Sequence, residues 1–285
     1  MSDGTPFAIV NAATVPAASV CNAFNAAFSD YLLKFPVLDA EGWRAFVRRQ
    51  GIDVSLSSVA CRYDAVVAFA TITPRPLQRS RIAVMGARPT ERGSGAAARL
   101  LDEAIAASEA RGDRWIELEA FAQNGRAVRL YRSRGFEAID EMPGFIAAPS
   151  EGLGQDADVI EVSNEDAAAW ACAFDREHSA YLPWQVGGEA ILAAVVPLRA
   201  WRLGSAQLVF QVVDGATLTV QSLIDRDSAQ RDALRLVAAW RHRYPAHTLR
   251  APQIQRASGP ARAFTDAGWT RQPLHQLLMR RPFRD

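Results

Sequence analysis

The sequence has little of what disulfide-rich, metal-binding and redox proteins carry. It contains three cysteines, Cys21, Cys61 and Cys172, far apart and in no C-x-x-C pair, and Lys34 is its one lysine. The cysteine pattern argues against a disulfide framework and suits a reducing, cytoplasmic compartment. The 4 histidines are scattered through the second half without the spacing of metal ligands. We therefore expect no metal site.

Other absences limit the partners that we expect. The net charge is +1, which argues against binding of nucleic acid or of an anionic membrane. No positive charge precedes Lys34, so a signal peptide is not expected. The longest uncharged apolar stretch, near residues 190–198, is too short to cross a bilayer. The G-x-x-x-x-G-K-S/T run of many nucleotide-binding enzymes does not occur.

The composition and length indicate a globular protein with more than one part. Apolar residues make up 49% of the chain and charged residues 22%, which is ordinary for a soluble protein. A length of 285 residues suits one large or two medium domains. Residues 149–158, PSEGLGQDAD, are polar and show no apolar periodicity, which is typical of a linker. We expect one domain at residues 1–150 and a second at residues 157–285.

The two halves resemble each other. Residues 23–32 read AFNAAFSDYL and residues 173–182 read AFDREHSAYL, with five of ten positions identical at an offset of 150 (173 − 23). The two halves also have similar C-terminal motifs. In the first half Tyr131 is followed four positions later by Gly135-Phe136, and in the second half Phe264 is followed by Gly268-Trp269. A period of this size predicts a duplicated domain, since the repeats of a solenoid are much shorter.

Hydrophobic periodicity predicts alternating strands and helices in both halves. In the first half we expect strands at residues 7–11, 57–62, 65–73, 81–87, 115–121 and from about 136, and helices at residues 15–28, 41–50, 96–109 and 125–134. In the second half we expect strands at residues 207–213, 217–224 and 248–255, and helices at residues 229–242 and 259–267. This mixture predicts an α/β fold with a mixed sheet.

The most informative stretch is RIAVMGARPTERGSGAAARLLDEAI, residues 81–105. An apolar strand runs into a short turn with two glycines, and a helix begins at once. Free N–H groups at the start of a helix, together with the helix dipole, bind anions. We expect such a site at six consecutive residues, in which the first adds a cation and the others offer backbone N–H groups: Arg92, Gly93, Ser94, Gly95, Ala96 and Ala97.

This stretch resembles the acetyl-CoA signature Q/R-x-x-G-x-G/A of the GNAT superfamily of N-acyltransferases. Ala87-Arg88-Pro89 before it is similar to the V-x-P approach of that family, with Ala in place of Val. After it, the spaced residues Asn124, Ala127, Leu130-Tyr131 and Gly135-Phe136 resemble the closing motif N-x-x-A-x-x-L-Y-x-x-x-G-F. The resemblance covers residues 64–139 well and the first sixty only loosely.

The resemblance implies acetyl-CoA as the co-substrate and an N-acetyltransferase activity on a primary amine. It implies that the end of the strand at Met85, Gly86 and Ala87 splays from the next strand and holds the pantetheine arm between them. It gives Asn124 a bond to that arm, although Asn is also a favoured helix N-cap. It gives the Tyr131 hydroxyl the place of a general acid for the departing thiolate.

The resemblance further implies direct attack of a neutral amine on the thioester in a ternary complex, with a backbone N–H of Met85 or Gly86 facing the oxyanion. A base or a water relay must take the amine proton. Glu117 and Glu119 alternate along one strand and project to one face, so either is a candidate base. The alternative for both residues is a solvated strand face. Tyr31 stands where the family often contacts the acceptor, but Tyr181 repeats it, which favours packing.

The second half lacks the polar residues of this site. At the place of the glycine turn it has DRDSAQ, residues 225–230, where carboxylates would repel a diphosphate. Phe264 stands for Tyr131, and Ala257 stands for Asn124. We therefore expect a degenerate GNAT-like domain there.

The acceptor remains open at this stage between a small-molecule and a peptide amine, and the assembly between a monomer and a homodimer. Two alternatives compete with an active enzyme. One is a CoA-binding regulatory or interaction protein without turnover, and the other is a purely structural protein.

Overall fold

The structure, a computed structural model, describes residues 7–150, 155–178 and 182–283. The predicted linker at residues 149–158 and the repeated segment at residues 173–182, which includes Tyr181, therefore lie partly outside the described residues. The chain forms two compact units. The first unit comprises Met1–Glu119, Asn124–Glu137 and Met279–Asp285, and the second unit comprises Ala120–Gln123 and Ala138–Leu278.

These units are not consecutive pieces of the chain. Strand β6, Glu137–Ala147, follows the last helix of the first unit, yet all but its first residue belongs to the second unit. Strand β12, Thr270–Pro282, lies mostly in the second unit, and its last residues belong to the first. The division into domains at residues 1–150 and 157–285 therefore stays a prediction.

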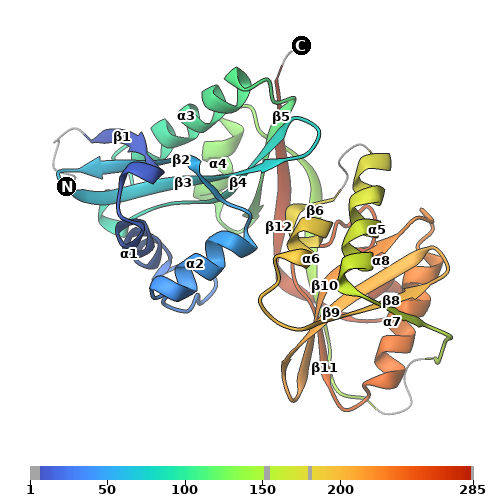
Figure 1. The fold of residues 1–285 in the computed structure, drawn as a ribbon. Helices are drawn as coiled ribbons and strands as arrows, with labels where there is room; N and C mark the ends of the chain where they lie inside the picture. Colours follow the sequence, from blue (N-terminus) through green and yellow to red (C-terminus); the bar gives the residue numbers. More distant parts are fainter. Residues whose placement is uncertain (1–6, 151–154, 179–181, 284–285) are drawn as a thin grey trace. The chain divides into compact units, whose positions relative to one another are not determined.

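The first unit contains five strands and four α-helices among its described residues (Figure 1). The strands follow the order β1-β2-β3-β4-β5, antiparallel except for the parallel pair β4 and β5. Their bounds are β1 Ala8–Asn11, β2 Asp53–Arg62, β3 Ala65–Arg75, β4 Arg79–Ala87 and β5 Trp115–Phe121, the last two residues of which group with the second unit. The helices are α1 Ala17–Phe28, α2 Ala40–Arg49, α3 Ala96–Ala110 and α4 Gly125–Arg132, with the short 3-10 turns η1 Ala12–Thr14 and η2 Pro89–Glu91.

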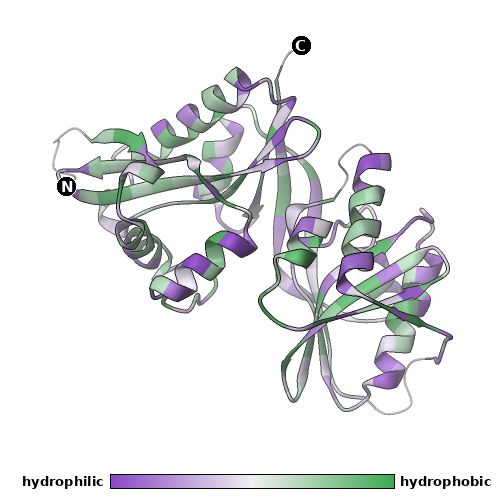
Figure 2. Ribbon diagram, viewed as in Figure 1, coloured by the Kyte–Doolittle hydropathy of each residue, from purple (hydrophilic) through white to green (hydrophobic). Residues whose placement is uncertain are grey.

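The core of the first unit has two apolar layers, one on each face of the sheet. Successive strand residues point to opposite faces. Accordingly, Val59 packs with α1 and α2, whereas its neighbour Ala60 packs with the start of α3. On β3, Phe69 faces α1, while Ala68 and Ala70 face α3. Strand β3 is therefore apolar on both faces. Helix α2 carries hydrophilic residues between residues of intermediate or apolar character (Figure 2).

Along the chain, the strands and α-helices from β7 to β12 follow in the same order as those from β1 to β6. The strands of the second unit follow the order β12-β6-β11-β10-β9-β8-β7 in the sheet, with β10 and β11 parallel. Besides β6 and β12, its strands are β7 Ile160–Val162, β8 Leu198–Leu203, β9 Ala206–Asp214, β10 Thr217–Asp225 and β11 Thr248–Ala251. Its helices are α5 Asn164–Glu177, α6 Gly188–Leu192, α7 Arg231–Arg243 and α8 Ala261–Asp266, with the 3-10 turn η3 Trp184–Val186.

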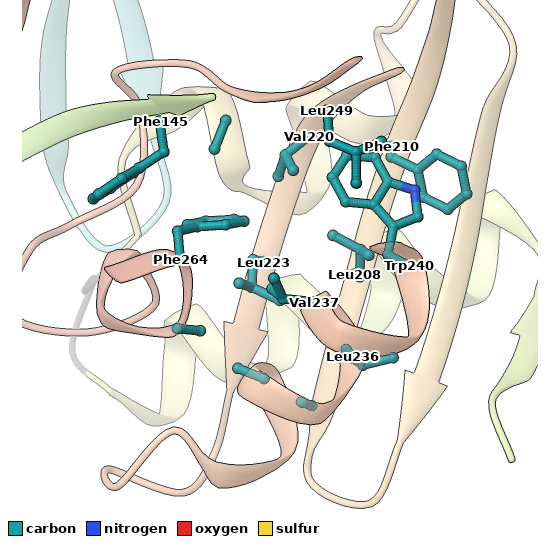
Figure 3. Packing of buried hydrophobic residues seen from close by; sticks show 14 of the residues in the cluster. Phe145, Leu208, Phe210, Val220, Leu223, Leu236, Val237, Trp240, Leu249 and Phe264 are labelled. Carbon is teal, nitrogen blue, oxygen red and sulfur yellow. The ribbon is translucent and has the colours of Figure 1, made fainter. Parts of the chain in front are cut away.

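Aromatic rings close the core of the second unit (Figure 3). Phe264 of α8 stacks on Phe145 of β6 with ring centroids 5.7 Å apart. Trp240 of α7 lies 5.2 Å from Phe210 of β9. All four rings are buried at 2% exposure or less. The core of this unit therefore includes a strand that follows the first unit's last helix.

The predicted mixed α/β class is confirmed, and the predicted elements recur within a few residues of their expected limits, apart from the short strand β11. No element was predicted at β7, α5, α6, β8 or β12. Among the described residues, no helix is long and apolar enough to span a membrane.

Candidate functional site

The turn between β4 and α3 adopts a conformation that glycine allows. Gly93 has φ 94° and Gly95 has φ 88°, both in the left-handed region. Gly95 is the N-cap of α3, and a Cβ built on it would meet no atom within 4 Å. The glycines therefore serve the backbone path and leave open space beside the start of the helix.

The predicted anion site has five backbone N–H groups, of which two are already engaged. The Ser94 N–H donates to the Glu91 carbonyl at 3.2 Å, and the Ala96 N–H donates to the Ser94 hydroxyl at 3.3 Å. The N–H groups of Gly93, Gly95 and Ala97 make no hydrogen bond within the described part of the chain. Three donors at the positive end of a 15-residue helix are thus available to an anion.

The Arg92 side chain is engaged within the protein. Its guanidinium donates to both carboxylate oxygens of Asp30, at 2.5 and 2.7 Å, and to the Ala27 carbonyl at 3.1 Å. These bonds lower the pKa of Asp30 and raise that of Arg92. Arg92 therefore links the turn to the end of α1. The Asp30 carboxylate compensates the positive charge of Arg92, which the sequence motif suggests as a contact for a bound anion.

Strands β4 and β5 separate halfway along their length. Their paired residues run from Arg79 and Trp115 to Ile82 and Leu118, although β4 continues for five residues beyond Ile82. The register of β4 with β3 also shifts here, between the pairs of Val84 and Ile82. A shift of this kind bends a strand. Beyond Ile82 the facing edges of β4 and β5 are unpaired among the described residues, and we call this unpaired stretch the gap between the two strands.

The last residues of β4 face this gap in alternation. The N–H and C=O of Val84 both bond the Thr71 hydroxyl of β3, and the Arg88 N–H donates to the Val67 carbonyl. Because peptide groups alternate along a strand, those of Met85 and Ala87 point the other way, toward the gap.

Gly86, between them, faces β3 and lies under α1. A Cβ on this residue would come within 3.0 Å of the Ala27 Cβ and 3.1 Å of the Phe69 ring. Of the two oxyanion donors that were left open, the geometry therefore favours Met85, and the absence of a side chain at Gly86 lets α1 approach the sheet.

Asn124 and Tyr131, at the two ends of α4, both lie near Tyr31. The Asn124 side chain caps the helix by accepting from the Ala127 N–H at 3.2 Å, and it also hydrogen-bonds the Tyr31 hydroxyl. Tyr131 is buried, with 8% exposure. Burial raises the pKa of Tyr131 well above its ordinary value, and the neighbouring Tyr31 adds to the shift. The Tyr131 phenol is therefore protonated at physiological pH, which is the form that a general acid requires.

The two candidate bases are enclosed by arginines. Glu117 is 1% exposed and lies 3.0 Å from Arg75 and 3.2 Å from Arg280. Glu119 lies 2.7 Å from Arg81, whose guanidinium donates to both carboxylate oxygens. Both side chains are almost fully buried and their carboxylate oxygens contact guanidinium groups, so neither carboxylate is open to a substrate amine. These contacts argue against either residue as the base, and against the solvated strand face as well.

Sequence reasoning missed Asp30, Arg75 and Arg81, which decide what the predicted residues can do. Asp30 lies 62 positions from Arg92, and Arg81 lies 38 positions from Glu119. No local pattern marks such pairs, because the fold alone brings them together. The only signal in the sequence was an acidic residue or an arginine within a strand that is otherwise predicted to be apolar.

Residues 19–136 match the model of the Acetyltransferase (GNAT) family. A GCN5-related N-acetyltransferase from Anabaena variabilis ATCC 29413 superposes with a TM-score of 0.68 at 14% identity, over 97% of this chain and 73% of that one. The chain has the GNAT fold.

Two further GCN5-related N-acetyltransferases share this GNAT fold. The protein from Kribbella flavida superposes with a TM-score of 0.65 at 19% identity, over 97% of this chain and 71% of that one. The protein from Sphaerobacter thermophilus superposes with a TM-score of 0.62 at 12% identity, over 98% and 96%. No curated protein matches the chain.

The second unit has a counterpart of the glycine turn, but a side chain of the same unit occupies it. Gln230, the N-cap of α7, is left-handed with φ 58°, as Gly95 is before α3. Next to it, the Asp225 carboxylate accepts from the Ala233 N–H and the Asp227 N–H, both at 2.8 Å, and from the Ser205 hydroxyl at 2.7 Å. A carboxylate of the chain thus occupies the helix N-terminus. Over the described residues, no three His, Cys, Asp or Glu side chains gather as metal ligands do.

Proposed function

We propose that the first unit transfers the acetyl group of acetyl-CoA to a primary amine. The observation that carries this proposal is the gap between β4 and β5 beside the turn before α3. A gap lined by the peptide groups of Met85 and Ala87 suits an extended chain of amides, as in pantetheine. The free N–H groups of Gly93, Gly95 and Ala97 suit a diphosphate. The match of residues 19–136 to the GNAT family supports the same reading.

The reaction that we infer is direct attack in a ternary complex. The amine nitrogen forms a bond to the thioester carbonyl carbon, the carbon–sulfur bond breaks, and the sulfur leaves as a thiolate. The Met85 N–H donates to the oxyanion in between. The Tyr131 hydroxyl gives its proton to the thiolate. The amine proton passes to a water relay, since ion pairs hold Glu117 and Glu119.

We further propose that the second unit is a degenerate GNAT-like domain that arose with the first by duplication. The same order of elements and the left-handed N-caps Gly95 and Gln230 support this. The Asp225 carboxylate opposes binding of any phosphate at α7. Phe264 stands in the place of Tyr131, so that unit also has no acid for a thiolate. One working site per chain is the result, whether the protein is a monomer or a homodimer.

A charge placed at the turn tests the binding site. In Gly95→Glu, a carboxylate enters the open space before α3, and we expect binding of acetyl-CoA to be abolished. Gly112→Glu is the matched control, because Gly112 lies beyond the other end of α3 with φ 77° and no atom within 4 Å of its Cβ. The two variants share the added charge and the backbone strain. Equal affinity for acetyl-CoA, measured by calorimetry, would refute the site.

Turnover separates an enzyme from a CoA-binding regulator. Thiol release from acetyl-CoA should appear with at least one member of a panel of small-molecule and peptide amines. Binding of acetyl-CoA without thiol release over the whole panel would support the regulatory alternative. Absence of binding by the wild-type protein would leave only the structural one.

A further inference from the structure

We propose that Arg126 supplies the cation for the diphosphate of acetyl-CoA, in the place that the sequence motif gives to Arg92. This inference rests on the proposed function and names a further residue of the same site. It follows from where three guanidinium groups lie, those of Arg92, Arg126 and Arg129.

The first step is the engagement of Arg92. Its three hydrogen bonds to Asp30 and Ala27 use its donors on the α1 side of the turn. The Asp30 carboxylate cancels its charge at a distance of 2.5 Å. To offer an uncompensated charge to a diphosphate, Arg92 would have to give up this pair. The turn therefore needs its positive charge from elsewhere.

The second step is the position of Arg126. It is the second residue of α4, and its side chain is exposed. Its Nη2 lies 3.9 Å from the point where a Cβ on Gly93 would stand, so the guanidinium rests against the glycine turn. Within the described part of the chain, no carboxylate pairs with Arg126. Arg126 thus brings an uncompensated charge to the free N–H groups of Gly93 and Gly95.

The third step is an unfavourable feature of α4. The first turn of a helix favours acidic residues, because the helix dipole is positive there. The first turn of α4 has no acidic residue and carries Arg126 instead. A bound anion would remove this conflict, since it would lie between the arginine and the N-terminus of α3. Local conflicts of this kind often occur at functional sites.

The backbone ends α4 and α8 in the same way. Phe136 N–H donates to the Tyr131 carbonyl at 3.2 Å, and Trp269 N–H donates to the Phe264 carbonyl at 3.0 Å. Gly135 and Gly268, with φ 80° and 75°, precede these donors. The two helix ends therefore correspond at an offset of 133 (264 − 131).

At the same offset, Arg129 corresponds to Arg262, whereas Arg126 corresponds to Gly259. An arginine that both units keep is explained by the scaffold. Arg126 occurs only in the unit whose helix N-terminus is open, and it is absent where Asp225 fills the corresponding helix. This distribution is expected of a phosphate contact. The planar fork of a guanidinium can also donate two parallel hydrogen bonds to phosphate oxygens.

The test compares wild type, Arg126→Gln and the control Arg129→Gln, with three acetyl thioesters. Acetyl-CoA carries the diphosphate and the 3′-phosphate, acetyl-3′-dephospho-CoA carries only the diphosphate, and S-acetylpantetheine carries neither. We expect Arg126→Gln to weaken binding of the first two by about tenfold or more, as for loss of a hydrogen bond to a charged group. Its affinity for S-acetylpantetheine should equal that of wild type, and Arg129→Gln should bind all three as wild type does.

Each other outcome has a definite meaning. If the wild type binds no acetyl-CoA, the proposed function fails, and the assignment of Arg126 fails with it. If the wild type binds acetyl-CoA and Arg126→Gln binds it equally well, only the assignment of Arg126 is overturned. A loss with acetyl-CoA but not with the dephospho compound would assign Arg126 to the 3′-phosphate and overturn its place on the diphosphate. Equal losses in Arg126→Gln and Arg129→Gln would show a general effect of charge and overturn it as well.

Discussion

The Glu117 carboxylate lies 3.2 Å from the Arg280 guanidinium, which comes from the last strand of the chain. Arg280 also lies over the Trp115 ring, with 4.4 Å between the guanidinium carbon and the ring centroid. Three residues after Arg280, the Phe283 N–H donates to the Arg114 carbonyl at 2.9 Å. The described residues 279–283 are thus part of the first unit's packing around β5, and Glu117 is a centre of that packing.

Glu117→Gln should therefore destabilise the protein. The amide is neutral and would leave Arg75, whose side chain is fully buried, without its carboxylate. Breaking one partner of a buried ion pair costs about 3–5 kcal/mol. Urea unfolding followed by tryptophan fluorescence measures this loss, with Glu103→Gln on the exposed side of α3 as the control. A variant as stable as wild type that has lost turnover and its pH dependence would return Glu117 to the list of bases.

Tyr131→Phe should lower kcat and leave the affinity for acetyl-CoA nearly unchanged. General acid catalysis contributes roughly 10²–10⁴-fold, so we expect a loss of about a hundredfold. The raised pKa of Tyr131 means that the phenol stays protonated below its ordinary value of about 10. The acid therefore imposes no fall in kcat between pH 6 and roughly 10. Steady-state thiol release across pH measures both effects.

The control for this change is Tyr63→Phe, because Tyr63 is 78% exposed. It removes the same hydroxyl group from a phenol in contact with solvent. Unchanged kcat in Tyr131→Phe at every pH would remove Tyr131 from the mechanism. A parallel loss in both variants would have the same consequence.

Asp30→Asn should strengthen binding of acetyl-CoA by a few fold at low salt. The substitution removes the charge that compensates Arg92, and the freed guanidinium adds to the attraction for a polyanion. Because Arg92 lowers the pKa of Asp30, the pair persists at neutral pH and is lost only as the pH falls below about 4.

Calorimetric titration with acetyl-CoA at two salt concentrations measures the effect of Asp30→Asn, and the gain should shrink as salt rises. Weaker binding at both salt concentrations would contradict the prediction. It would indicate that Asp30 preserves the shape of the turn more than it screens Arg92.

The sequence predicts well those parts of the fold that depend on neighbouring residues. The apolar run of β4, the two glycines and the periodicity of α3 locate the turn, since only glycine adopts these φ values without strain. Asn124 before α4 and Gly135 after it mark the ends of that helix by their capping chemistry. These features depend on residues that are close together in the sequence, so they can be predicted without knowledge of the fold.

The partners of the site residues could not be predicted in this way. Arg92 looks like a free cation until α1 brings Asp30 beside it. Glu117 and Glu119 look like a solvated or catalytic pair until β4 and the end of β12 surround them with arginines. The assignment of β6 to the second unit has no local signal either, because a strand's pattern does not say which sheet it will join.

Asp225 should matter for the stability of the protein and not for the binding of acetyl-CoA. Asp225→Ala removes the acceptor for the Ala233 N–H, the Asp227 N–H and the Ser205 hydroxyl, in a residue that is only 5% exposed. Donors left unsatisfied in a buried site cost about 1–3 kcal/mol, and loss of a helix cap costs a similar amount. We expect a lower midpoint of thermal unfolding and an unchanged calorimetric Kd for acetyl-CoA.

Ser228→Ala is the control for Asp225→Ala, because it changes a neighbouring exposed residue that accepts none of these bonds. It should change neither the midpoint nor the Kd. If Asp225→Ala weakened acetyl-CoA binding while the protein stayed folded, the binding site would lie in the second unit. In that case the open helix N-terminus at Gly95 would be a feature of the backbone alone.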